Sequence, residues 1–337
     1  MKPIVSAIVS TYNAELFIKK RIENLLQQSI ADKIEIIIIN SGSLQNEENI
    51  IQMFLQNHQN IKYIRTENRE TIYKAWNRGI SISTGTYITN ANTDDILRND
   101  ALEIMTRVLD SDKTIGMVYA DQFFSFLPNQ DFKTLENKIK YRKPNFTLLH
   151  LLERCIIGSQ PVWRSSIHFE EGIWFDESYE IAGDYEFELK VAFKYKIQHV
   201  DDFLGIYYKS PQKLNKEFQN FENTFKETYT IMDYFCRKFI SQAPPDKIAK
   251  LIKKLYALCS FIPQPLYNVC NKIHSKLNFK KPMHERYFLI WFLSLYFEMI
   301  GDSFASRNWL MRHLGNSSLP LLKKRLSDLN EFNKLNP

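Results

Sequence analysis

The sequence predicts an α/β fold, in which a doubly wound and mostly parallel sheet carries helices on both faces and a helical C-terminal region follows. Over the first 125 residues, runs of β-branched residues alternate with segments of helical period, which is typical of βαβ units. Residues 36–39 are apolar without alternation, as in a central strand covered on both faces. Beyond about residue 216 the strand pattern stops, and helical segments are separated by prolines.

The elements follow in order along the first part of the chain. Strands are expected over residues 4–10, 34–39, 61–65, 86–91 and 117–124. Helices are expected over residues 14–28, 47–57, 72–83 and from about 98 to 110. Right-handed crossovers then place helices on both faces of the sheet. A polar connection with two prolines ends this pattern. We therefore expect a domain over residues 1–215, in halves 1–125 and 126–215, and a helical region over 216–337.

The composition is that of an ordinary globular protein, with 44% apolar and 24% charged residues. The four cysteines contain no Cys-x-x-Cys pair and no secretory leader follows Met1, so a disulfide framework is not expected and a cytoplasmic protein is. Within the net charge of +6, residues 237–286 hold eleven Lys or Arg against two acidic residues. This segment either forms a solvated basic face or contacts the anionic inner membrane face peripherally. The apolar stretch 287–300 is too short to span a bilayer.

Two adjacent carboxylates, Asp94 and Asp95, follow the strand expected over residues 86–91. Ligands of open α/β sheets bind at the carboxyl ends of strands, and paired carboxylates there are poorly explained by packing. The pair is therefore a candidate site for a divalent cation, whose preferred ligands are oxygens. The alternative is that it caps a helix starting near Arg98.

Short polar residues follow the first two strands as well. The first strand ends in Ser10, Tyr12 and Asn13 without a Gly-x-Gly-x-x-Gly turn, which argues against a dinucleotide fold. Tyr12 can stack on a nucleobase, or it can be a rim aromatic of the core. Asn40 and Ser41 end the second strand at the same edge of the sheet. All are candidates for binding a nucleotide.

These motifs in this order resemble the family-2 glycosyltransferases of the GT-A fold. The resemblance covers roughly residues 3 to 210 and has six segments: residues 5–13, 35–43, 73–80, 83–95, 158–164 and 181–189. It implies transfer of a sugar from a nucleoside-diphosphate sugar to an acceptor hydroxyl with inversion, in the synthesis of a surface polysaccharide or glycoconjugate. The acceptor would be a saccharide or a lipid-linked saccharide, and no nucleic acid is expected.

The resemblance also assigns roles to residues. Asp94 and Asp95 correspond to the motif that holds Mn²⁺ or Mg²⁺ on the diphosphate, with Asp94 also able to reach the ribose. The residues implied for the nucleotide sugar are Ser10, Tyr12, Asn13, Asn40, Ser41, Asn77, Asn92 and Asp94. A cation on the leaving diphosphate is what this chemistry requires.

Asp184 corresponds to the general base of the family, with Glu180 as a weaker alternative. Without the resemblance, Asp184 after Gly183 would be a helix N-cap. The residues implied for the acceptor are Trp163, Arg164 and Glu186. An aromatic ring beside a guanidinium suits a sugar and its hydroxyls, while a core Trp with a surface Arg is the alternative.

The chain departs from the family pattern at three places. Asn40 and Ser41 replace an acidic pair, Asn92 replaces an acidic residue of the metal motif, and Trp76 replaces an Arg before Asn77. The last change leaves Lys74, Arg78 or Arg69 to face the diphosphate. The departures motivate a rival hypothesis, a non-catalytic nucleotide- or sugar-binding module that scaffolds a partner through its helical tail.

Overall fold

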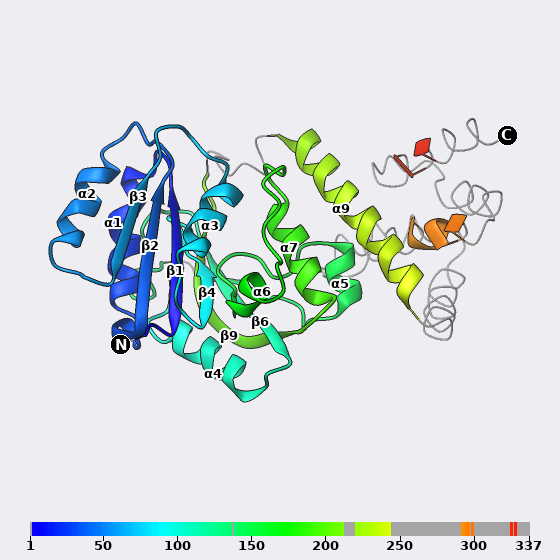
Figure 1. The fold of residues 1–337 in the computed structure, drawn as a ribbon, viewed down its shortest axis with the longest axis horizontal. Helices are drawn as coiled ribbons and strands as arrows, with labels where there is room; N and C mark the ends of the chain where they lie inside the picture. The colour runs from blue at the N-terminus through cyan, green and yellow to red at the C-terminus, as the bar shows by residue number, and fades with distance from the viewer. Residues whose placement is uncertain are drawn as a thin grey trace. The chain divides into compact units, whose positions relative to one another are not determined.

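The computed structural model describes residues 2–136, 138–211, 220–243, 291–296, 298–299, 324–325 and 327–328. The chain divides into two compact units, Met1–Thr228 and Tyr229–Pro337. The first unit contains the whole sheet (Figure 1). A domain boundary near residue 215 stays a prediction, because residues 212–219 lie outside the described part.

The strands of the first unit form one mixed sheet. They are β1 (Val5–Thr11), β2 (Ile34–Asn40), β3 (Ile61–Arg65), β4 (Tyr87–Asn90), β5 (Ile96–Leu97), β6 (Ile115–Ser125), β7 (Ile139–Tyr141), β8 (Val162–Arg164) and β9 (Lys196–Tyr208). Their order among the described residues is β3-β2-β1-β4-β8-β6-β9-β5, with β7 beside β6. β1 to β4 pair in parallel, as do β6 and β9, while β5, β7 and β8 pair antiparallel. The α/β class is confirmed, with a sheet less parallel than expected.

Helices cover both faces of this sheet, as predicted (Figure 1). They are α1 (Glu15–Leu26), η1 (Ala31–Lys33), α2 (Glu47–Leu55), α3 (Ile72–Ser81), α4 (Ala101–Ser111), α5 (Leu148–Glu153), α6 (Ser166–Phe169) and α7 (Gly183–Ala192). Val5, Ala7 and Val9 of β1 belong to one core cluster with α1, α2 and α4. Ile8 points to the other face, where a Cβ on Gly79 of α3 would lie 2.6 Å from its Cγ2. Glycine therefore permits the close approach of α3 to the sheet.

The structure contradicts the helix-cap interpretation of the aspartate pair. Asp94 and Asp95 are followed by β5, which pairs antiparallel with β9 through Ile206 and Gly205. α4 begins only at Ala101, with Asp100 in the N-cap position. A two-residue strand cannot be recognised from periodicity, so the sequence pattern extended the helix back to Arg98.

The helix α9 (Phe221–Gln242) leads into the second unit. In this unit the described residues of the apolar stretch, 291–296 and 298–299, are helical, and Trp291, Phe292, Leu293 and Leu295 are fully buried. Across the part of the chain that the structure describes, no helix has the length and apolar character to cross a bilayer. Of the basic segment 237–286, residues 244–286 lie outside the described residues, so its peripheral membrane contact remains a prediction.

Candidate functional site

A cavity of about 410 Å³ lies among β4, β6, β9 and the start of α7. Its lining is mostly polar and aromatic: Trp76, Asn90, Asn92, Gln122, Phe124, Tyr141, Lys143, Cys155, Gly158, Ser159, Asp184, Tyr207 and Lys209. The sequence-predicted base, Asp184, therefore shares a cavity with Asn92 of the aspartate motif. These two positions are brought together although 92 residues separate them in the sequence.

Several polar atoms of this cavity are buried without a hydrogen-bond partner among the described residues. They are Trp76 Nε1, Asn90 Oδ1, Asn92 Oδ1 and Gln122 Oε1. Buried polar atoms are nearly always paired in folded proteins, because leaving one unpaired costs about 1–3 kcal/mol. A donor and three acceptors facing one cavity therefore fit a polar ligand.

Asp95 lies beside this cavity and is 1% exposed. Its Oδ1 accepts from the backbone N–H of Tyr208 at 3.1 Å, and its Oδ2 accepts from Asn92 Nδ2 at 3.4 Å. Burial, with repulsion from Asp94, raises the pKa of Asp95 to about 7. Burial also raises the pKa of Asp94. A buried carboxylate beside a half-buried one, with the pKa of both raised by burial, is a suitable site for a divalent cation.

Arg21 supplies positive charge near these carboxylates. It was not among the site residues predicted from the sequence. It is fully buried on α1, and its guanidinium NH1 donates to the backbone carbonyl of Asp95 at 3.1 Å. Burial lowers the pKa of Arg21 to about 10, against the raising effect of Asp95 and Asp94. The available signal was its position between Ile18 and Leu25 on the apolar face of the expected helix. A charge there needs a buried partner.

Asp184 stands in the first turn of α7, half-buried at the cavity. Tyr73 Oη lies 3.4 Å from Asp184 Oδ1 and donates to the backbone carbonyl of Ile181 at 2.6 Å. One turn later, Glu188 is 2% exposed and accepts from Cys155 Sγ at 3.4 Å. Burial and the charge of Asp184 raise the pKa of Glu188 well above its usual range. The half-buried Asp184 thus has a fully buried carboxyl group, that of Glu188, one helical turn away.

Glu227 of α9 anchors the segment that leads into α7. Its carboxylate accepts from the backbone N–H groups of Glu180, Ile181 and Ala182 at 3.0, 3.0 and 2.9 Å. Three charge-assisted hydrogen bonds on consecutive residues fix the chain immediately before Asp184. No local sequence pattern joins positions 180 and 227, so this contact was missed.

Replacing Glu227 by Ala is expected to lower kcat by about 10- to 100-fold, because small displacements of a reacting group are costly. The KM for the donor should change little, since the aspartate motif is untouched. Glu227→Gln keeps one carbonyl acceptor and should recover part of the rate, while Glu222→Ala, an exposed change on the same helix, should not alter it. Equal loss in Glu222→Ala would contradict a positioning role. Steady-state kinetics of all three variants decide this.

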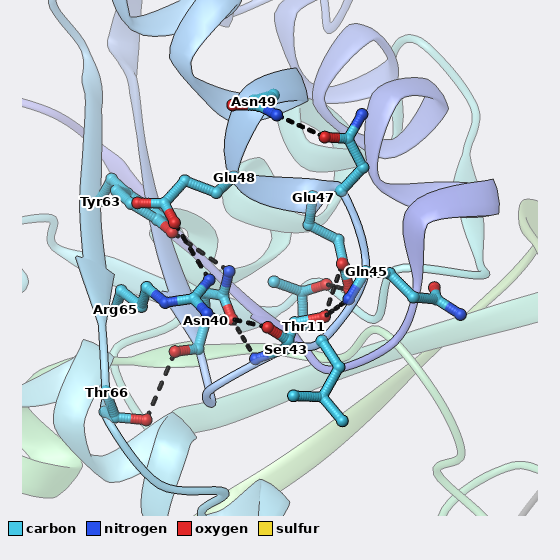
Figure 2. A network of polar contacts seen from close by, with 12 residues as sticks. Thr11, Asn40, Ser43, Gln45, Glu47, Glu48, Asn49, Tyr63, Arg65 and Thr66 are labelled. Atoms are coloured by element: carbon cyan, nitrogen blue, oxygen red, sulfur yellow. Dashed lines mark hydrogen bonds and ion pairs between the residues drawn. The ribbon is translucent and has the colours of Figure 1, made fainter.

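The turns after β1 and β2 are joined by one polar network (Figure 2). Glu47, fully buried at the start of α2, accepts from Ser43 Oγ at 2.5 Å and from the backbone N–H of Ala14 at 2.6 Å. Asn40 accepts from the N–H of Ser43 at 2.8 Å and donates to Tyr63 Oη at 3.1 Å. The Asn40 side chain is thus committed to shaping this turn, and the nucleotide contact predicted for it is not supported.

The remaining strand-end candidates are placed differently. Ser41 Oγ is buried without a partner among the described residues, so it can still bind a ligand. Asn13 adopts φ 51° and accepts from the N–H of Leu44 at 3.1 Å. The Arg69 guanidinium lies over the Tyr12 ring, 4.3 Å from the ring centroid. Ser10, half-buried at the end of β1, lies beside Ile39 of β2.

The structure does not support the nucleotide contact predicted for Asn77. It donates to the backbone carbonyl of Phe175 at 2.9 Å and to Glu177 Oε1 at 3.0 Å, which ties α3 to the segment before α7. Of the three basic candidates near it, Arg78 and Lys74 pair with Glu70, and Arg69 makes no ion pair among the described residues. The distances to Glu70 Oε1 are 2.5 Å from Arg78 NH2 and 3.7 Å from Lys74 Nζ.

The structure does not support the acceptor roles predicted for Trp163 and Arg164. Trp163 is 1% exposed and donates through Nε1 to His168 Nε2 at 2.8 Å. Arg164 donates to the backbone carbonyls of Ile115 and Leu109. β8 therefore carries a core residue and a structural arginine.

Glu186, the third residue predicted to contact the acceptor, is not among the residues lining the cavity. The residue is 7% exposed, and its carboxylate pairs with Lys190 Nζ at 2.8 Å on the same helix. An acceptor contact by Glu186 is therefore not supported.

The buried Trp163–His168 pair predicts a pH-dependent stability. Burial lowers the pKa of His168 to about 4, below the usual 6.5, so the unfolded chain binds this proton more readily. The free energy of unfolding should therefore fall by about 3 kcal/mol as pH drops from 6.5 to 4. Urea unfolding across this range should show a shallower fall in His168→Gln. His58→Gln should keep the wild-type slope, and equal slopes in all three proteins would refute the assignment.

Comparisons with known proteins find glycosyltransferases. A family model described as glycosyl transferase family 2 matches residues 6–168. The glycosyltransferase MJ1057 of Methanocaldococcus jannaschii is 26% identical over 217 residues, which cover 60% of this chain and 74% of that protein. The chondroitin synthase of Pasteurella multocida is 28% identical over 200 residues, covering 59% of this chain and 20% of that protein. The matching segment is thus a fifth of the synthase.

Among solved structures, residues 1–349 of S. aureus TarS, crystallised with UDP-GlcNAc, superpose with a TM-score of 0.61. The identity is 17%, and the match covers 99% of this chain and 92% of that one. At this identity the likeness concerns the fold, which is the GT-A type of sheet with helices on both faces.

Proposed function

This chain belongs to glycosyl transferase family 2, and from that premise we propose that it transfers a sugar from a nucleoside-diphosphate sugar to an acceptor hydroxyl with inversion. The observation that carries the proposal is the shared cavity of Asp184 and Asn92, where Trp76, Asn90 and Gln122 also present unpaired polar atoms. A base on one side and a carboxylate motif on the other are what a single displacement at an anomeric carbon needs.

Asp94 and Asp95 would hold a divalent cation, Mn²⁺ or Mg²⁺. The fit rests on their burial, on their mutual repulsion and on the unpaired Oδ1 of Asn92 nearby. When bound, the cation supplies positive charge to the leaving diphosphate. Arg21 donates a hydrogen bond to the backbone carbonyl of Asp95, and the Tyr208 N–H and Asn92 orient the Asp95 carboxylate.

Asp184 would accept the proton of the acceptor hydroxyl. Tyr73 lies beside its Oδ1, and Glu227 holds the preceding backbone, so the carboxylate is positioned before substrate arrives. Burial raises the pKa of Cys155 and of Glu188 well above the usual range of each, which disfavours their charged forms. Asp184 is the carboxylate that lines the cavity and is available to the acceptor.

On the donor side, Ser41 and Tyr12 are the proposed contacts of the nucleoside, with Ser10 and Asn13 shaping the turn. UDP-GlcNAc binds the TarS structure, and a UDP-sugar is therefore the first donor to test. The similarity to a chondroitin synthase supports a role in polysaccharide synthesis. The non-catalytic module is not favoured, because Asp184 shares its cavity with Asn92, whose side chain donates a hydrogen bond to Asp95.

The test is release of nucleoside diphosphate from a panel of UDP-, GDP- and dTDP-sugars with Mn²⁺, with Mg²⁺ and with EDTA. We expect turnover of at least one sugar, dependent on the cation and faster with an acceptor mixture. Binding of the nucleotides without turnover of any donor, with every acceptor class, would favour the non-catalytic module instead.

A further inference from the structure

Lys143 lies at the cavity on a firmly held piece of backbone. Its N–H donates to Asp121 Oδ1 at 2.8 Å, and Asp121 is fully buried. The same carboxylate meets His199 Nε2 at 2.8 Å and Arg142 NH1 at 3.2 Å. Three groups from two segments thus fix Asp121, and Asp121 fixes the start of the Lys143 side chain.

The Lys143 side chain is 7% exposed and lines the cavity that contains Asp184. Its ammonium packs against Gly158, where an added Cβ would stand 2.2 Å from Nζ at a backbone φ of +75°. It also lies 4.0 Å from the centroid of the Tyr141 ring. Among the described residues the ammonium makes no hydrogen bond and no ion pair. A buried ammonium that makes no ion pair is costly, so its position at a cavity points to an anion that arrives with a ligand.

The ammonium belongs to the side of the cavity that holds the base. Its charge acts on Cys155 and Glu188, the neighbours of Asp184. The cation that acts on Asp94 and Asp95 is Arg21. The anion that Lys143 would meet is therefore closer to the attacking hydroxyl than to the leaving diphosphate.

Aromatic rings form the wall next to this ammonium. The rings of Phe124 and Tyr141 stack at 4.6 Å, and Tyr207 meets Phe124 edge-on at 5.9 Å. All three line the cavity. Aromatic faces suit the apolar faces of sugar rings, and a cation beside them suits a carboxylate or phosphate.

We propose that Lys143 is the anion-binding residue of the acceptor subsite, and that the acceptor is an anionic saccharide with a carboxylate or phosphate close to the glycosylated hydroxyl. This inference rests on the proposed glycosyltransferase function. Gly158, which has no side chain, leaves space for the ammonium, and the Phe124 and Tyr141 rings contact the sugar ring.

The test compares wild type with Lys143→Met, Lys143→Arg and the control Lys140→Met, an exposed lysine of β7. Inorganic phosphate and glucuronate, with glucose as the neutral match, are titrated by NMR in the presence of saturating nucleoside diphosphate and Mg²⁺, which is diamagnetic. Transfer is measured to glucuronides, sugar phosphates and neutral glycosides. In wild type the anionic probes should bind more tightly than glucose. Lys143→Met should weaken them and lower kcat/KM for anionic acceptors by about 10- to 100-fold.

Donor binding and acceptor-independent donor hydrolysis should stay within about twofold in Lys143→Met, and Lys143→Arg should restore part of the anionic preference. A large loss of nucleoside diphosphate affinity in Lys143→Met would assign the ammonium to the donor and overturn the proposal. Equal binding of phosphate, glucuronate and glucose by wild type would also overturn it. Absence of donor hydrolysis with every nucleotide sugar would instead refute the proposed function, and the probe titrations would still report on Lys143.

Discussion

Asp184→Asn should lower the rate of sugar transfer by about 10³-fold, within the range that a general base contributes. The amide cannot accept the hydroxyl proton, yet it keeps the size of the carboxylate and an acceptor oxygen for the Tyr73 hydroxyl. Donor affinity should therefore change little. The measurement is kcat with a saturating acceptor, together with the dissociation constant of the nucleoside diphosphate in the presence of Mn²⁺.

The matched control is Asp32→Asn, the same chemical change at an exposed position before β2, at the opposite edge of the sheet. It should behave as wild type. If Asp184→Asn retains more than a tenth of the wild-type kcat, the base is another group. Glu188, one turn along α7, and Glu180 are then the carboxylates to replace.

Asp95→Asn should abolish the cation dependence of nucleotide binding and lower transfer by about 10²- to 10³-fold, the scale of losing one strong electrostatic contact to a transition state. The stability of the folded protein should not decrease. Removing one of two adjacent buried carboxylates relieves repulsion, and Asn can still accept from the Tyr208 N–H. The melting temperature without metal should therefore be equal to wild type or higher, which is the usual trade between function and stability.

Calorimetric titration of nucleoside diphosphate with and without Mn²⁺, alongside thermal unfolding, separates these effects. A variant that unfolds at much lower temperature would show that Asp95 is a structural residue, and its loss of activity would then say nothing about the cation. Unchanged stimulation by Mn²⁺ would place the cation elsewhere.

Much of the fold was predictable because its signals are local. β-branched runs and helical periods located the first strands and helices, and polar residues at strand ends located the edge of the sheet where Asp95 lies. The short antiparallel strands were missed, because two or three residues carry no period and their pairing partners are distant in sequence. β9 was missed because it continues a segment of mixed character.

The site was predictable only where a motif carried it. The shared cavity of Asp184 and Asn92 agrees with the resemblance, whereas the side chains of Asn77 and Trp163 have hydrogen-bond partners within the protein. Their polar atoms meet partners inside the first unit, and sequence cannot reveal whether an amide or indole is already satisfied. Arg21 and Glu227 were overlooked for the converse reason, since each acts on backbone groups far along the chain.

The hydrogen bond from Tyr208 to Asp95 joins residues 113 positions apart and comes from the last residue of β9. Chains emerge from the ribosome at about 5–20 residues per second, and N-terminal parts begin to fold first. The parallel strands β1 to β4 can thus assemble well before the aspartate motif is complete. A growing chain that ends before residue 208 would contain the parallel strands but would lack the backbone donor to Asp95. We therefore expect activity only after the whole of β9 has been synthesised.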